Sequence, residues 1–229
     1  MTEKIIQQGA EANIILIRAK GREPFIIKDR IKKNYRLSEI DDEIRSRRTR
    51  SEAKLLEKAS QVINSPKPFF EPCIKNSSKL KMPFIEGKKL SDHLDSFPLK
   101  EEKKICRIIG ENTAKLHDTD IIHGDLTTSN MIYVKNNRES NENINGKRGD
   151  RKGFKVFFID FGLGFGSHKI EDKAVDLHLL RQALEAKHFK HWKELFNEVS
   201  KGYSISKNHK LVLKQLEKVE KRGRYKGNY

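Results

Sequence analysis

The spacing of apolar and polar residues predicts strands early in the chain and a long helix among them. Short apolar runs rich in β-branched residues predict strands at residues 5–6, 13–18, 24–28 and 80–85. A helix is expected over 39–63, because one face collects the apolar residues Leu55, Leu56, Ala59, Val62 and Ile63. Ser38 directly precedes this helix and is the expected cap.

Helical spacing dominates the rest of the chain. A short helix is expected at 91–94 and a longer one over 99–118. Three later apolar sets repeat at helical spacing and are expected in the core: Leu177, Leu180 and Leu184; Trp192, Leu195, Phe196 and Val199; Val212, Leu216 and Val219. Two strand-like runs, 131–134 and 154–159, interrupt the helices, and each lies beside polar residues suited to chemistry.

Composition adds a strong positive charge to this picture. The 229 residues include 48 Lys and Arg against 32 Asp and Glu, a net charge of +16, which favours a polyanionic partner over a merely soluble basic surface. The two cysteines, Cys73 and Cys106, lack metal-ligand spacing and suit a reducing compartment without disulfides. The apolar runs are too short to cross a bilayer. We therefore expect a cytoplasmic protein, with a nuclear location left open.

Two short motifs carry the most specific chemistry. Residues 123–130 read H-G-D-L-T-T-S-N, and residues 160–162 read D-F-G. In phosphotransferases of the protein-kinase type, one carboxylate orients the attacking oxygen, while an amide and a second carboxylate hold the metal ions that bridge the phosphates. Asp125 fits the first role, and Asn130 and Asp160 fit the metal roles. Asp and Asn are common in ordinary turns, but both motifs in this order, beside strand-like runs, predict a phosphotransferase site.

A lysine and a glutamate complete the expected catalytic set. Lys28 ends the apolar run Phe-Ile-Ile-Lys, as a strand lysine that reaches nucleotide phosphates would. A carboxylate on the long helix should pair with it, and Glu52 and Glu43 are the two candidates. A group of four arginines just before Glu52 cannot all face a core, so it predicts a solvated or ligand-facing edge: Arg45, Arg47, Arg48 and Arg50.

Nucleotide contacts are expected at two further places. Gly9, Ala10 and Glu11 form a turn where a loop covering phosphates would lie, although a single glycine also fits a plain hairpin turn. Phe84 and Glu86 border the point where two lobes would join and where an adenine would meet backbone groups.

Two segments are expected to lie outside the core. Residues 136–153 contain one apolar side chain and predict a disordered insertion between two strands. Residues 221–229 form a basic tail with four cationic side chains, Lys221, Arg222, Arg224 and Lys226.

Several strings along the chain resemble the small atypical kinase subunit of the KEOPS (EKC) complex, a family also called PRPK. The resemblance covers nearly the whole chain, and the insertion at 136–153 departs from the compact family pattern. The matching strings are Q-G-A-E-A at 8–12, R-R-T-R-S-E-A at 47–53, H-G-D-L-T-T-S-N at 123–130, I-D-F-G-L at 159–163, E-D-K-A-V-D-L at 171–177 and R-G-R at 222–224.

This resemblance implies an α+β, small bilobal protein-kinase-like fold without an activation segment. The β-rich N-lobe with one long helix would span 1–86, and the α-rich C-lobe would span 87–229. By position, Lys28 and Glu52 match the family's lysine–glutamate pair, Asp125 its catalytic aspartate, and Asn130 and Asp160 its metal ligands.

The resemblance also implies cofactors, activity and partners. Members of the family bind ATP with Mg2+, act as a serine/threonine kinase or as an ATPase, and support threonylcarbamoyladenosine modification of tRNA. The threonylcarbamoyl-transferase subunit would contact the C-lobe, and a small regulatory subunit would contact the N-lobe. Contact with tRNA would be made through the complex, and no membrane is implied.

Two other functions stay open at this point. An aminoglycoside-phosphotransferase-like enzyme would share the H-G-D motif, but few residues after Gly162 are available for a substrate lobe. A non-catalytic tRNA-binding scaffold would suit the basic charge but would not need Lys28, Asp125, Asn130 and Asp160. Gly124 replaces the arginine of H-R-D, so control by a phosphorylated activation loop is not expected.

Overall fold

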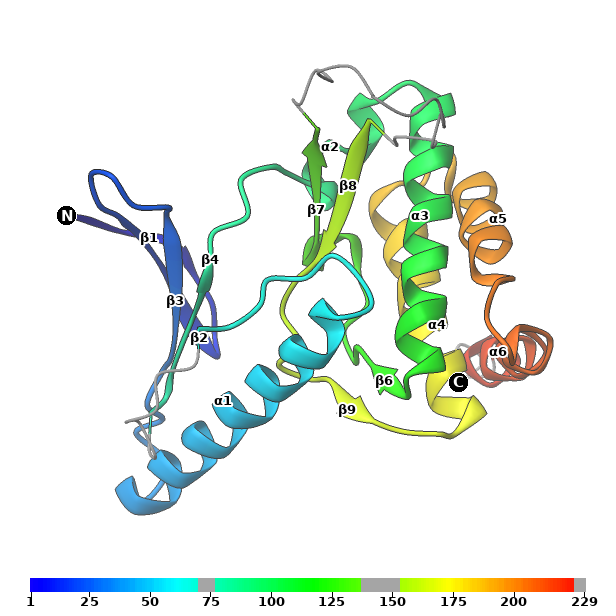
Figure 1. The fold of residues 1–229 in the computed structure, drawn as a ribbon. Helices are drawn as coiled ribbons and strands as arrows, with labels where there is room; N and C mark the ends of the chain where they lie inside the picture. The colour runs from blue at the N-terminus through cyan, green and yellow to red at the C-terminus, as the bar shows by residue number, and fades with distance from the viewer. Residues whose placement is uncertain (70–76, 137–152, 225–229) are drawn as a thin grey trace.

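The chain forms a strand-rich part and a helical part that meet along a shared core. The structure is a computed structural model that describes residues 1–69, 77–136 and 153–224, with 223 and 224 described by their backbone alone. Figure 1 shows the four-stranded sheet and helix α1 on one side and helices α3 to α6 on the other. Within the described residues, no helix is both long and apolar enough to cross a membrane.

The strand-rich part is one antiparallel sheet in the order β1-β2-β3-β4. Its strands are β1 (Thr2–Gln8), β2 (Ala12–Arg18), β3 (Phe25–Arg30) and β4 (Lys79–Pro83). Strand β1 is exposed over its whole length, whereas β2 buries Ala12, Leu16 and Ile17. The register places Ile14 of β2 opposite Lys28 and places Leu80 of β4 on its other side. The predicted strands are thereby confirmed in the structure.

Helix α1 (Ser38–Ser60) packs its apolar face into the core, where Leu56 and Ala59 are fully buried. The expectation for its cap was wrong. Leu37 is the N-cap residue and makes no side-chain hydrogen bond there. The Ser38 hydroxyl instead accepts a hydrogen bond from Lys32 Nζ at 2.7 Å, because the chain enters the helix one residue earlier than its polar pattern indicates.

The helical part is built around the contact between α3 (Leu99–Asp118) and α5 (Trp192–Tyr203). Two glycines allow their backbones to approach closely. A Cβ atom on Gly110 would lie 2.0 Å from the Val199 carbonyl oxygen, and one on Gly202 would lie 2.0 Å from the Arg107 carbonyl oxygen.

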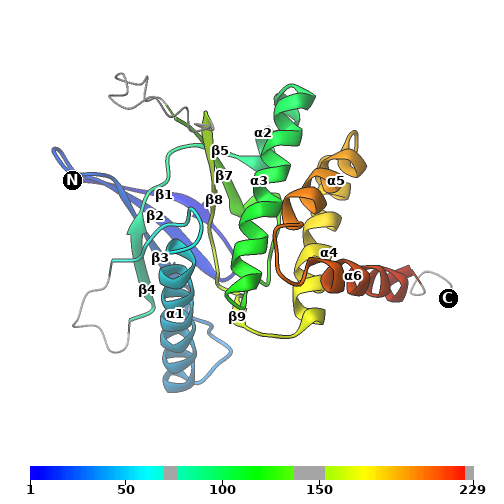
Figure 2. The ribbon, with the colours of Figure 1, turned by 45° about the vertical axis from the view of Figure 1, so that its right-hand side comes forward.

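Helices α4 (Ile170–Lys187) and α6 (His209–Arg224) complete the helical part, and Figure 2 shows α6 beside α4 at the outer edge of this part. The prediction of a tail over 221–229 was wrong for residues 221–224, which belong to α6, and residues 225–229 lie outside the described residues.

Short strands and turns between the two parts carry the predicted motifs. They are β5 (Lys88–Lys89), α2 (Leu90–His93), η1 (Leu94–Ser96), β6 (Ile121–Ile122), the turn η2 (Thr128–Asn130), β7 (Met131–Lys135), β8 (Phe154–Phe158) and β9 (Phe165–Gly166). Strand β7 pairs with both β5 and β8, and β6 pairs with β9. The Asn136 amide donates to the Gly153 carbonyl oxygen at 3.0 Å. Residues 137–152 of the insertion expected at 136–153 lie outside the described residues. Only residues 167–169 separate β9 from α4, so no activation segment is present there.

Candidate active site

Glu52 joins two cations of β3 in the interior. Lys28 Nζ lies 2.7 Å from Glu52 Oε1, and Arg30 Nη2 lies 2.6 Å from Glu52 Oε2. All three residues are buried. The candidate partner of Lys28 is therefore Glu52, whereas Glu43 is exposed on α1. Residues 28 and 30 point to the same side of the strand, so one carboxylate can hold both cations.

The same lysine reaches the D-F-G motif. Lys28 Nζ lies 2.7 Å from Asp160 Oδ1, which also accepts a hydrogen bond from the Gly162 amide at 3.1 Å. Burial alone would raise the pKa of Asp160, but the charge and hydrogen bond of Lys28 outweigh it, so the pKa lies below its usual value. Asp160 is therefore ionised at neutral pH. Its backbone has φ 61°, a conformation that Asp and Asn tolerate better than other side chains do.

Asp125 and Asn130 lie together at the other motif. Asn130 Nδ2 donates to the Asp125 carbonyl oxygen at 2.9 Å and to Asp125 Oδ2 at 2.8 Å. The backbone also connects the two motifs, because the Ile159 amide donates to the Asn130 carbonyl oxygen at 2.9 Å. Lys28, Glu52 and Asp160 thus lie in direct contact, and a backbone hydrogen bond links this group to the segment that carries Asp125 and Asn130.

Asp176 is a residue of this region that the sequence patterns did not single out for a role. Its side chain is 1% exposed and accepts hydrogen bonds from the His123 amide at 2.8 Å and the Gly124 amide at 3.0 Å. His117 Nε2 lies 3.3 Å from the same carboxylate, and its Nδ1 lies 2.9 Å from the Tyr203 hydroxyl. Asp176 therefore fixes the backbone just before Asp125. Its sequence signals are its place in the string at 171–177 that matches the family and its position beside the apolar face of α4.

Gly124 has a steric reason to be glycine. Its φ is 77°, and a Cβ atom there would lie 2.2 Å from the Leu163 carbonyl oxygen. The backbone after D-F-G thus fills the space that any side chain would need. This close approach accounts for the absence of an arginine between His123 and Asp125.

The residues predicted to contact the nucleotide lie on two connections between strands. Gly9, Ala10 and Glu11 connect β1 to β2, and the Gly9 amide donates to the Ala12 carbonyl oxygen at 3.1 Å. The Phe84 amide donates to the Pro24 carbonyl oxygen at 3.1 Å. Glu86 lies on the connection between β4 and β5.

An open hollow of about 550 Å³ lies beside Glu86 and is lined also by Phe97, Glu101 and Tyr133. Lys28, Asp125, Asn130 and Asp160 do not line it. The polar convergence, rather than this hollow, therefore marks the candidate active site.

Comparison with curated proteins shows the family. The chain is 40% identical over 234 residues to the KEOPS complex subunit Bud32 of Pyrococcus abyssi, and the match covers 97% of this chain and 96% of that protein. It belongs to the Bud32 family. A Methanococcus vannielii protein named as a probable bifunctional tRNA threonylcarbamoyladenosine biosynthesis protein is 39% identical over 225 residues. The Bud32-like chain spans only 36% of that longer relative. No family model matches the chain.

Solved structures show the same fold at low sequence identity. The Rio2 kinase of Chaetomium thermophilum, in a complex described as ADP/Mg2+-phosphoaspartate, superposes with a TM-score of 0.59 at 12% identity and covers 97% of this chain and 70% of that one. WaaP in complex with acyl carrier protein gives a TM-score of 0.55 at 12% identity, over 96% and 88% of the two chains. The expected small kinase-like fold is thereby confirmed for this Bud32 family member.

Proposed function

We propose that this chain binds ATP with Mg2+ and directs transfer or hydrolysis of the γ-phosphoryl group, as the kinase or ATPase subunit of a KEOPS complex that supports threonylcarbamoyladenosine modification of tRNA. The observation that carries the chemistry is the convergence of Lys28, Glu52 and Asp160 within 2.7 Å contacts. The name of the Pyrococcus relative supports the complex, and the name of the bifunctional relatives supports the tRNA modification.

The donor set fits a magnesium–nucleotide complex. Mg2+ prefers oxygen ligands and is usually held by one or two carboxylates together with substrate phosphates. Asp160 and Asn130 supply a carboxylate and an amide at the two motifs. Asn130 uses its amide nitrogen on Asp125, which leaves its amide oxygen without a hydrogen-bond partner among the described residues. Bound magnesium would neutralise charge on the phosphates.

The roles of the remaining residues follow from their contacts. Lys28, oriented by Glu52, would pair with phosphate oxygens. Asp125, fixed by Asn130, would orient an attacking hydroxyl or water and accept its proton. Gly9, Ala10 and Glu11 would cover the phosphates, and Phe84 and Glu86 would flank the adenine. The proposed acceptor is a serine or threonine hydroxyl in a kinase reaction and water in an ATPase reaction.

The proposed partners are the threonylcarbamoyl-transferase subunit at the C-lobe, a small regulatory subunit at the N-lobe, and tRNA reached through the assembled complex. Net positive charge of +16 suits such an assembly, because cationic side chains attract the phosphate backbone.

The test is ATP turnover by the purified chain, alone and with the transferase subunit and tRNA, with labelled γ-phosphate followed into both protein and free phosphate. Asp160→Asn and Asp125→Asn should each lower turnover by about 100-fold or more, a size typical of losing a catalytic proton acceptor or charge stabiliser. Glu185→Gln is the control, because Glu185 is exposed and has no partner among the described residues. Normal turnover by a folded Asp160→Asn protein would refute the assignment.

A further inference from the structure

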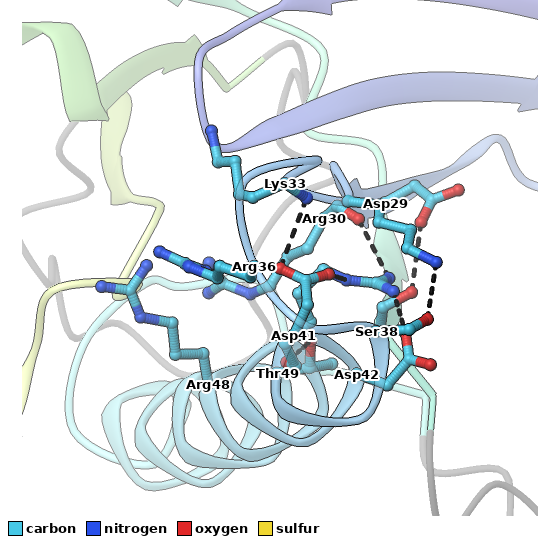
Figure 3. Close-up of polar contacts among 12 residues, drawn as sticks. Asp29, Arg30, Lys33, Arg36, Ser38, Asp41, Asp42, Arg48 and Thr49 are labelled. Atoms are coloured by element: carbon cyan, nitrogen blue, oxygen red, sulfur yellow. Dashed lines mark hydrogen bonds and ion pairs between the residues drawn. The ribbon is translucent and has the colours of Figure 1, made fainter.

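Two cations from outside the sheet hold the loop between β1 and β2. Lys33 Nζ donates to the Ala10 carbonyl oxygen at 2.6 Å. Arg48 Nη1 on α1 lies 2.9 Å from Glu11 Oε2. Figure 3 shows Lys33 on the segment that precedes α1 and Arg48 on α1 itself. The loop is thus held both through its backbone and through its one charged side chain.

On the β1 side, the loop is fixed by the pairing of β1 with β2, which reaches Gln8 and Asn13, and by the Gly9 amide bond to the Ala12 carbonyl oxygen. Every residue of β1 is exposed, so no core packing holds this strand. On the β2 side, the Ile31 amide donates to the Glu11 carbonyl oxygen at 3.1 Å. A hairpin end without burial is free to move unless polar contacts restrain it. The contacts of Lys33 and Arg48 are therefore well placed to set the position of the loop.

A buried carboxylate anchors this arrangement. Asp41 is fully buried, accepts a hydrogen bond from Arg45 Nε at 2.6 Å and from the Lys33 amide at 3.3 Å, and is also bound by Arg36. Arg45 Nη1 in turn donates to the Arg30 carbonyl oxygen at 3.3 Å. Figure 3 shows Lys33 and Arg36 beside Asp41. The segment that carries Lys33 is thereby tied to the strand that carries Lys28 and Arg30.

The four arginines of α1 divide into two kinds. Arg45 and Arg48 bind carboxylates, whereas Arg47 and Arg50 are exposed and have no partner among the described residues. Glu11 is an anion in a loop expected near phosphates, where it would repel them. Arg48 neutralises that charge, which a solvent-facing arginine such as Arg50 does not do.

The loop lies on the edge of the candidate active site. Ala12, the first residue after it, pairs with Arg30 in the register of β2 and β3. Arg30 Nη2 and Lys28 Nζ would each lie 3.4 Å from a Cβ atom on Gly162 of the D-F-G motif. The loop therefore adjoins the end of β3 that carries the cations facing that motif.

We propose that Lys33 and Arg48 are positioning residues that hold the loop formed by Gly9, Ala10 and Glu11 against the triphosphate of a bound nucleotide. They set the affinity for a nucleoside triphosphate and take no part in the chemistry. This inference rests on the proposed function, because it assumes that the site binds ATP.

The experiment uses the full chain. Calorimetry measures the Kd of a non-hydrolysable ATP analogue with Mg2+, and steady-state kinetics measure kcat and KM for ATP. Arg48→Gln and Lys33→Met should each raise the Kd of the analogue and the KM by roughly three- to tenfold, the range expected for one lost polar contact. The kcat should stay within about twofold, and the affinity for adenosine, which has no phosphates, should not change. Arg50→Gln is the matched control on the same helix.

A second variant separates electrostatic positioning from a general structural effect. Glu11→Gln removes the anion that Arg48 neutralises, so the double variant Glu11→Gln/Arg48→Gln should recover the analogue affinity to within about twofold of Glu11→Gln alone. A double variant as weak as Arg48→Gln would refute the neutralising role of Arg48. Affinities of Arg48→Gln and Lys33→Met equal to that of Arg50→Gln would overturn the inference and leave the proposed function intact. Absence of analogue binding by the unmodified chain would overturn both.

Discussion

Lys28 and Asp160 lie 132 positions apart in the chain, yet their Nζ and Oδ1 atoms are 2.7 Å apart. Lys28 belongs to β3 of the four-stranded sheet, whereas Asp160 follows β8 beside the helical part. Their contact therefore joins the two parts of the molecule at the candidate active site. Lys28 also binds Glu52, so its ammonium group has a second anionic partner on α1.

The buried carboxylate of Glu52 predicts a large effect on stability. Glu52→Gln keeps the shape of the side chain but leaves Arg30 without a buried anionic partner, while Lys28 retains Asp160. We expect a loss of about 2–3 kcal/mol in the free energy of unfolding, less than the full cost of breaking a buried ion pair. Urea denaturation would measure it. Glu57→Gln on the same helix is the control, and an equal effect of the two changes would contradict the buried role of Glu52.

Gly124 provides a test of backbone packing at the catalytic motif. Gly21 and Gly124 both have positive φ, 74° and 77°, but a Cβ atom on Gly21 meets nothing within 4 Å. Gly21→Ala should therefore cost only the conformational strain, about 1 kcal/mol. Gly124→Ala adds a contact of 2.2 Å with the Leu163 carbonyl oxygen and should cost about 3 kcal/mol or more, together with most ATP turnover. Equal melting temperatures for the two variants would show that the loop after D-F-G moves freely.

Most of the fold and four polar residues of the candidate site could be predicted from local patterns, which left Glu52 and Glu43 as alternatives for the partner of Lys28. Strands over 13–18 and 24–28, and the helix over 99–118, follow from apolar spacing, which reports directly which face is buried. The motifs around Asp125 and Asp160 are recognisable because kinase-type chemistry needs those side chains at that spacing.

Arg30 and Asp176 could not be predicted in the same way. Arg30 follows the apolar run of β3 and resembles a solvated strand end until the partner Glu52, 22 positions away, is known. Asp176 lies beside the apolar residues of α4 and looks like part of its polar face, yet it is 1% exposed. Apolar spacing identifies buried faces, but it does not say which distant backbone amides a buried carboxylate will bind.

Asp176 is expected to affect catalysis more than nucleotide binding. The two Asp176 oxygens accept hydrogen bonds from the His123 and Gly124 amides. In Asp176→Asn, one of these oxygens becomes an NH2 group, which cannot accept a hydrogen bond. The backbone before Asp125 should shift, and kcat should fall by roughly 10- to 100-fold. The Kd for the ATP analogue should change little, because Lys28, Glu52 and Asp160 keep their contacts. Asp172→Asn, on the same helix and bound to Ser167, is the control. A loss of affinity with unchanged kcat would contradict this positioning role.

The pH dependence of stability tests the Lys28–Asp160 pair. Lys28 holds the pKa of Asp160 below its usual value in the folded protein, against the opposing effect of burial. A carboxylate with a lowered folded pKa contributes stability that is fully present above its unfolded pKa, about 3.9, and is lost as pH falls through the folded pKa. The difference in unfolding free energy between the unmodified chain and Asp160→Asn should therefore be constant from about pH 5 to 8 and shrink below about pH 4.

Asn is the suitable replacement here because it tolerates the φ of 61° at this position, so backbone strain does not enter the comparison. The Asp160 side chain is 45% exposed, so solvent weakens the pair and the difference should be smaller than for the buried Glu52 contacts. Denaturant titrations at each pH would measure it, with Glu185→Gln as the control for removing a carboxylate. A difference that stays constant down to pH 2, or that grows as the pH falls, would show that the Lys28–Asp160 contact does not stabilise the ionised form of Asp160.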